Sequence, residues 1–149
     1  MNQRLIVHQE IEIDAPASNV WQVLVKPEFI KQWDDVPESF DEPELQLGSE
    51  LVWHLEEDEF TQLTVTELVP FKRLRTSLYV SNWEPAEELG PDDIGYLYEL
   101  TEREGRTALS ITVGDFGKLA DGERYYEATI GFAEEASAQI KRLAEGLSS

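Results

Sequence analysis

The chain has 149 residues, 41% of them hydrophobic, and it contains no cysteine. This length and composition predict one globular domain over residues 1–149, and the lack of cysteine excludes disulfides and thiolate chemistry. With 31 acidic against 12 basic residues the net charge is −19, which disfavours binding to nucleic acid or to anionic membranes.

The acidic excess has two interpretations. It is either an ordinary solvated surface or an adaptation to high salt, in which case the melting temperature should rise between low and molar salt. No apolar run is long enough to cross a membrane, and the N-terminus lacks the apolar region of a signal peptide. We therefore expect a cytoplasmic protein.

The chain begins with a strand and two short helices. Residues 4–13 alternate apolar and polar side chains, which predicts a strand with one wet face. Residues 16–25 carry apolar side chains at helical spacing, with Asp14 or Ser18 as the candidate N-cap. A proline ends this helix, and a second short helix is predicted over 28–33.

A run of about six antiparallel strands follows. Turn residues such as Gly48 and the segment 104–106 separate the apolar segments. The loop over 82–93 is longer than an ordinary hairpin connection and carries Trp83. The strand signals lie at residues 45–47, 51–55, 60–69, 74–80, 94–100 and 109–113.

The last segment, 122–147, predicts one long amphipathic helix. Its apolar stripe comprises Thr129, Ala133, Ala136, Ile140, Leu143 and Leu147. The element order predicts an α+β fold, in which a curved antiparallel sheet packs its apolar face on this helix. Ala133 and Ala136 make the middle of the helix face small, so the sequence predicts either a cavity beneath it or simply close packing.

Several short motifs carry a family resemblance. They are Ile13-Asp14-Ala15-Pro16 with Val20-Trp21, Pro27-Glu28 with Trp33, Glu104-Gly105-Arg106-Thr107-Ala108-Leu109, and Gly131-Phe132. In this order, over nearly the whole chain, they resemble the START-like or helix-grip superfamily, also called SRPBCC. The match is closest to the branch named after activators of the Hsp-90 ATPase, in which Gly-Trp stands where this chain has Gly131-Phe132.

The resemblance implies a hydrophobic tunnel between the long helix and the sheet. Members of the superfamily include lipid carriers, plant hormone receptors and polyketide cyclases, and the fold does not choose among them. Two departures separate this chain from the chaperone activators. The segment 47–50 reads Leu-Gly-Ser-Glu where the branch often has Gly-Gly, and the activators' separate N-terminal domain is missing. Chaperone activation is therefore not expected.

Aromatic side chains make the best candidate site, because they line small-molecule pockets and offer a few polar tips. The alternative for each is ordinary core packing, which we expect for Trp21. Trp83 is a candidate lid over a cavity mouth. The predicted ligand-binding residues are Trp33, Trp53, Leu78, Trp83, Tyr96, Tyr98, Phe116, Phe132, Ala136 and Ile140.

Signals for catalysis or metal binding are weak. His8 and His54 fall on the wet strand faces without a ligand cluster, so no metal site is expected. Asp115 is a candidate for the cavity mouth, and Arg73 and Arg75 either anchor a ligand carboxylate or pair with acids across strands. No phosphate loop, nucleophile elbow or dinucleotide fingerprint is present, so no cofactor is expected.

Three functions remain open at this point. The first is the binding or carriage of a small hydrophobic ligand in a cavity between the sheet and the C-terminal helix. The second is a cyclase- or hydrolase-like enzyme acting on an apolar or aromatic substrate through a buried tyrosine or acid. The third is an acidic protein-interaction module that docks a basic partner. A homodimer through an exposed sheet edge is also open.

Overall fold

The computed structural model describes residues 5–34, 43–54, 60–80, 94–114, 116–118 and 122–147. The elements, in chain order, are β1 (Val7–Ile13), α1 (Ala17–Val25), α2 (Pro27–Trp33), β2 (Glu50–His54), β3 (Phe60–Val69), β4 (Arg73–Val80), β5 (Gly95–Arg103), β6 (Arg106–Gly114), the 3-10 turn η1 (Phe116–Lys118) and α3 (Gly122–Gly146).

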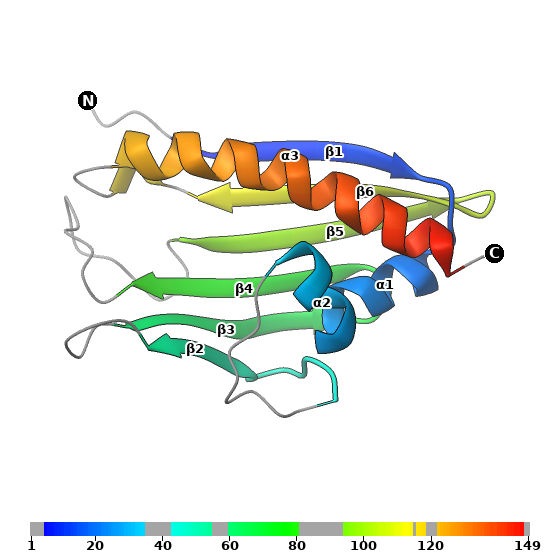
Figure 1. The fold of residues 1–149 in the computed structure, drawn as a ribbon, viewed down its shortest axis with the longest axis horizontal. Coiled ribbons are helices and arrows are strands. Elements are labelled where there is room, and N and C mark those ends of the chain that lie inside the picture. Colours follow the sequence, from blue (N-terminus) through cyan, green and yellow to red (C-terminus); the bar gives the residue numbers. More distant parts are fainter. Residues whose placement is uncertain are drawn as a thin grey trace.

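The strands form one six-stranded antiparallel sheet in the order β1-β6-β5-β4-β3-β2. All three helices lie on one face of it (Figure 1). The long helix α3 runs along β1 and β6, while α1 lies beside its C-terminal end and α2 beside its middle. The predicted α+β helix-grip fold is confirmed.

Alternation of side chains decides which face of the sheet is buried. On β6, Leu109, Ile111 and Val113 are fully buried and face the helices. On β1, Val7 and Ile13 are buried while the residues of the other parity are exposed, as the sequence predicts. The apolar face therefore meets the helix layer, and the charged face meets water.

The stripe on α3 is partly as predicted. Ala133, Ala136 and Ile140 are each no more than 1% exposed and pack on the sheet. The prediction is wrong at Leu147, which is 39% exposed, because α3 ends at Gly146. Ala144 is the last buried residue of the helix instead.

The segment 45–47 is not a strand, so the strand predicted there is wrong. The Gln46 amide donates to Ser49 Oγ at 2.8 Å, and the Leu45 amide donates to the Val25 carbonyl at 2.8 Å. These bonds fold the segment into a turn, which leaves Leu47 68% exposed. One strand fewer than expected therefore follows the short helices.

The predicted N-cap of the first helix is also wrong. Pro16 occupies the cap position of α1, and neither Asp14 nor Ser18 provides a side-chain cap. The first amide of the helix, on Ala17, donates to Glu102 Oε1 at 2.6 Å. A carboxylate from the end of β5 thus satisfies a helix end that a local side chain would otherwise cap.

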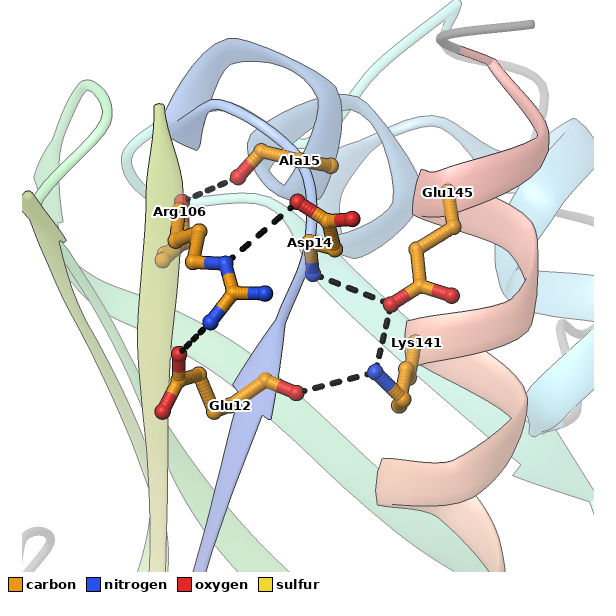
Figure 2. A network of polar contacts seen from close by, with 7 residues as sticks. Glu12, Asp14, Ala15, Arg106, Lys141 and Glu145 are labelled. Atoms are coloured by element: carbon orange, nitrogen blue, oxygen red, sulfur yellow. Dashed lines mark hydrogen bonds and ion pairs between the residues drawn. The ribbon is translucent and has the colours of Figure 1, made fainter. Parts of the chain in front are cut away.

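A polar network fastens α3 to the end of β1 (Figure 2). Arg106 pairs with Glu12 at 2.8 Å and with Asp14 at 3.5 Å. Lys141 donates to the Glu12 carbonyl at 3.1 Å and pairs with Glu145, which also accepts the Asp14 amide at 2.9 Å. The hydrogen bond from Lys141, followed by that from the Asp14 amide, lowers the pKa of Glu145.

Candidate functional site

A small cavity lies between the inner face of the sheet and helices α1 and α2. Leucine and isoleucine side chains supply most of its wall, together with four polar or aromatic-polar residues and one tryptophan. Its volume is about 40 Å³, which is room for only a few water molecules. Pockets that hold drug-sized molecules measure roughly 300–1,000 Å³, so the cavity is too small for such a molecule in this state. The residues other than the aliphatic ones are Trp33, Asp34, Thr76, Tyr96 and Tyr98.

The register of β4 and β5 places three of these side chains together. Thr76 lies opposite Tyr96, and Leu74 lies opposite Tyr98, in the antiparallel ladder. Directly opposed side chains on one face of a sheet are neighbours. The rings of Tyr96 and Tyr98 stack, with centroids 6.3 Å apart and planes 9° from parallel. Alternation along two adjacent strands thus builds one wall of the cavity.

Trp33, the last residue of α2, forms the opposite wall. Its ring meets that of Tyr98 edge to face, with centroids 6.0 Å apart. The indole Nε1 donates to the Val23 carbonyl of α1 at 2.9 Å. One hydrogen bond therefore orients the indole between α1 and the sheet, with its apolar body against the cavity.

Among the described residues, one fully buried polar atom in the cavity wall makes no hydrogen bond. Within the described residues, Thr76 Oγ1 is the buried side-chain oxygen that makes no hydrogen bond, and Thr76 is 7% exposed. An unsatisfied buried hydroxyl costs about 1–3 kcal/mol. Such an atom in a native structure calls for a partner or a function.

Both tyrosines of the cavity stay protonated. Burial raises the pKa of Tyr96 and of Tyr98 well above the usual value near 10, and the charge of Asp34 raises both further. Asp34 follows α2 directly, and its amide donates to the Ile30 carbonyl at 2.7 Å. The phenols are therefore hydrogen-bond donors at neutral pH and poor general bases.

The structure brings three of the predicted ligand-binding residues together at this cavity: Trp33, Tyr96 and Tyr98. Two more lie near it without lining it. Phe132 of α3 meets the ring of Tyr96 edge to face at 5.9 Å, and Leu78 packs against the core on the inner face of β4.

The other predicted ligand-binding residues lie elsewhere. Trp53 packs partly buried against the core on β2. Phe116 is buried and stacks on Tyr125, 6.3 Å away. Ala136 and Ile140 are buried where α3 meets the sheet, and within the described residues α3 contributes nothing to the cavity wall. Of the two proposed alternatives for the alanines, close packing is thus the one observed.

Trp83 and Asp115 lie outside the described residues. Sequence reasoning missed Asp34 and Thr76 as site residues. Thr76 had a signal, because it is the one polar residue between Leu74 and Leu78 on the apolar parity of β4.

The arginines of β4 pair with acids on the outer face of the sheet. Arg73 lies 3.4 Å from Glu67 and 3.5 Å from Glu99, and Arg75 lies 3.4 Å from Glu67. The predicted cross-strand pairing is confirmed. Both side chains are more than 40% exposed, so these pairs contribute little to stability.

The histidine His8 is exposed, as predicted, and its ring bonds to Thr112 at 3.1 Å. The side chain of His54 lies outside what the structure describes. Over the described ranges no three acidic or histidine residues gather in a way that could hold a metal ion. In the same ranges, no helix is both long and apolar enough to cross a membrane.

A wider surface groove of about 790 Å³ lies beside the start of α1 and the β3–β4 turn. Its walls carry Lys72, Arg73, Glu99 and Glu102, and half-exposed Phe71, whose ring contacts Trp21 at 6.3 Å. Trp21 itself is 8% exposed and packs in the core, as the sequence predicts. The groove is open to water and holds no unpartnered buried atom among the described residues, which makes the smaller cavity the better candidate site.

Comparison with protein families identifies the chain. A family model described as "Activator of Hsp90 ATPase homolog 1-like protein" matches residues 14–145. The chain belongs to this family. The motif-based resemblance to the SRPBCC superfamily, and to this branch of it, is confirmed. No curated protein matches the chain in sequence.

Several solved structures share the fold of this chain. Protein MLL2253 from Mesorhizobium loti has a TM-score of 0.71 at 19% identity, covering 93% of this chain and 95% of its own. DynU16, a putative protein in the dynemicin biosynthetic locus, has a TM-score of 0.69 at 15% identity, covering 94% of this chain and 47% of its own. The Aha1 dimer from Colwellia psychrerythraea has a TM-score of 0.57 at 16% identity, covering 91% and 97%. At these identities the likeness shows the fold alone.

Proposed function

We propose that the protein binds or carries a small, largely apolar ligand between the inner face of the sheet and helices α1 and α2. The observation that carries this proposal is the cavity lined by Trp33, Tyr96 and Tyr98. Apolar and aromatic walls with a few convergent polar groups are typical of small-molecule sites. The fold of the family is compatible with a ligand in such a place.

Binding must enlarge the cavity, because about 40 Å³ cannot hold a molecule of ten or more heavy atoms. The element that moves in this proposal is α2. It has seven residues, and its Trp33 reaches the backbone of α1 through one hydrogen bond, to Val23. A shift of α2 away from β4 and β5 would open the space in front of the tyrosines, at the expense of the contacts that α2 makes with α1 and α3.

The test is a ligand screen with a cavity-filling variant. Melting temperatures are measured against fatty acids, sterols, flavonoids and small aromatic metabolites. A ligand at about 100 times its Kd stabilises by roughly 2.7 kcal/mol, which raises the melting temperature of a domain of this size by several degrees.

Leu63 lines the cavity from β3, so Leu63→Trp should abolish that rise. Thr64→Trp, at the next position and on the opposite face of the same strand, is the matched control and should keep it. A screen without any shift, or shifts that survive in Leu63→Trp, would contradict the proposal.

A cyclase- or hydrolase-like enzyme is the second candidate, and the polar side of the cavity favours it. Asp34 and two protonated tyrosines stand in a mainly apolar site, as ionisable groups in active sites often do. Neutral phenols would donate hydrogen bonds to a substrate carbonyl oxygen as negative charge develops on it. If a ligand from the screen is converted to product, and Tyr98→Phe stops the conversion without stopping binding, the enzyme hypothesis replaces the carrier. Recovery of the ligand unchanged favours the carrier.

A further inference from the structure

Packing does not explain why position 76, in the wall of the cavity, is a threonine. It stands on the inner face of β4, opposite Val65 on one side and Tyr96 on the other. Its hydroxyl is buried and makes no hydrogen bond. Valine has nearly the same shape and would fill this position without burying an unsatisfied oxygen. The hydroxyl therefore costs stability and returns nothing to the packing of the ligand-free protein.

The surroundings of this hydroxyl define what could satisfy it. The cavity in front of it is otherwise walled on the β2 and β3 side by Leu51 and Leu63. A threonine hydroxyl donates one hydrogen bond and accepts others, so it pairs equally with an alcohol or with a carbonyl oxygen. A pure hydrocarbon would fill the apolar space and leave the hydroxyl unsatisfied.

The charge of Asp34 determines which ligand charges the cavity favours. Asp34 lines the half-buried end of the cavity that follows α2, and its charge raises the pKa of both tyrosines. A ligand carboxylate in the cavity would be repelled by the same charge. The site thus combines an unsatisfied neutral hydrogen-bonding group with a field that disfavours anions.

We propose that the ligand is a neutral, mainly apolar molecule with one hydroxyl or ketone oxygen, that this oxygen pairs with Thr76 Oγ1, and that Asp34 excludes carboxylates. This inference rests on the proposed ligand-binding function and narrows it. It separates alcohols, phenols and ketones from hydrocarbons and from fatty acids.

Three probes of one shape test it: 2-naphthol, naphthalene and 2-naphthoate, titrated at pH 7 by calorimetry or ligand fluorescence. We expect the wild type to bind 2-naphthol at least tenfold more tightly than naphthalene, and 2-naphthoate more weakly than 2-naphthol. Thr76→Val should lower the ratio between 2-naphthol and naphthalene several-fold, and Thr76→Ser should retain it. Asp34→Asn should strengthen the binding of 2-naphthoate selectively.

Folding is checked in the same variants. Thr76→Val should melt above the wild type in the absence of a probe, because its orphaned hydroxyl is gone. Thr101→Val, on the exposed part of β5, is the control and should leave all three affinities unchanged.

The outcomes separate the two levels of the proposal. If naphthalene and 2-naphthol bind equally well to the wild type and to Thr76→Val, the cavity binds ligands but the role of Thr76 is overturned. If 2-naphthoate binds as tightly as 2-naphthol with or without Asp34, the exclusion of anions is overturned. If none of the three binds to the wild type, the ligand-binding function fails together with the inference.

Discussion

The inner face of the sheet is covered in two different ways. Over β1 and β6 the cover is α3, a helix of 25 residues (Figure 1), and residues such as Ile111 and Val113 are 0% exposed. Toward β2, β3 and β4, Leu63 and Leu78 are only partly buried, and the cavity lies between Leu63 and α2. The region over β1 and β6, which we call the closed half, is filled by the packing of α3. The region over β2, β3 and β4, which we call the open half, is covered by the short helix α2, which leaves space beneath it.

The difference follows from side-chain size and helix length. α3 presents Ala133 and Ala136 to the sheet, and small residues let the two backbones approach closely. α2 has seven residues and inserts the bulky Ile30 and Trp33, which hold it off the strands. The small residues on the face of α3 therefore allow this helix to pack tightly on the sheet, whereas the large residues of the short helix α2 leave a space between it and the sheet. Ligand binding is expected where the cover is thin.

The largest expected effect is the contrast between two core truncations. Ile111→Ala should cost about 3–4 kcal/mol, because a fully packed site cannot collapse around the void. Leu63→Ala should cost about 1–2 kcal/mol, because that side chain already borders a cavity and is partly exposed. Urea unfolding of both variants measures the difference. Equal losses would show that the two halves are packed alike.

Two glycines of α3 sharpen the account of the closed half. A Cβ on Gly122 would lie 1.9 Å from the Phe116 carbonyl oxygen, so Gly122→Ala should cost about 2 kcal/mol or more. A Cβ on Gly131 would meet nothing within 4 Å, so Gly131→Ala should stabilise by about 0.5–1 kcal/mol through helix propensity. Thermal unfolding distinguishes the two. A loss at Gly131 would mean that the family's Gly-aromatic pair has a structural role that this exposed position does not reveal.

The sequence predicted the closed half better than the open one. Strict alternation on β6 and helical spacing on α3 are local patterns, and both were correct except where α3 ends before Leu147. The N-cap of α1 was not predictable in this way, since Glu102 reaches it from 85 residues away along the chain. The segment 45–47 failed because three residues of alternation are too few to outweigh the turn made by Ser49.

The candidate site was predicted by residue type and not by position. Of the aromatic side chains that the sequence put forward, Trp33, Tyr96 and Tyr98 meet at one cavity. Their meeting depends on the register between β4 and β5 and on the path of α2, neither of which a pattern in one segment encodes. In the sequence, Thr76 is noticeable only as a polar residue among the apolar residues on one face of β4. Its importance for the cavity follows from the structure, in which its hydroxyl is buried and makes no hydrogen bond.

The cavity tyrosines give a prediction at alkaline pH. Their pKa values are raised on folding, so above about pH 10 the unfolded chain releases protons that the folded protein retains. Stability present below pH 10 is therefore lost as the pH rises, by up to about 1.4 kcal/mol per pH unit for each tyrosine. In Tyr98→Phe the slope of unfolding free energy against pH, measured from pH 9 to 11, should be shallower than in the wild type. An unchanged slope would mean that the Tyr98 hydroxyl is hydrated, and that the open half is wet in solution.

The smallest expected effect tests whether the halves are independent. Glu145→Gln removes the charge that Lys141 pairs with in the network of Figure 2, and partly exposed pairs of this kind contribute less than about 1 kcal/mol. Because folding lowers the pKa of Glu145, its contribution is present above about pH 4.3 and lost as the pH falls through the folded-state pKa. The difference in unfolding free energy between wild type and variant should therefore shrink toward pH 3 and in molar salt, which screens the pair.

Affinity for any ligand of the cavity should not change in Glu145→Gln, since the network holds α3 to β1 and includes no residue of α2. If the variant lost affinity along with stability, the position of α3 would affect the cavity in the open half. The closed half and the open half would then not be independent.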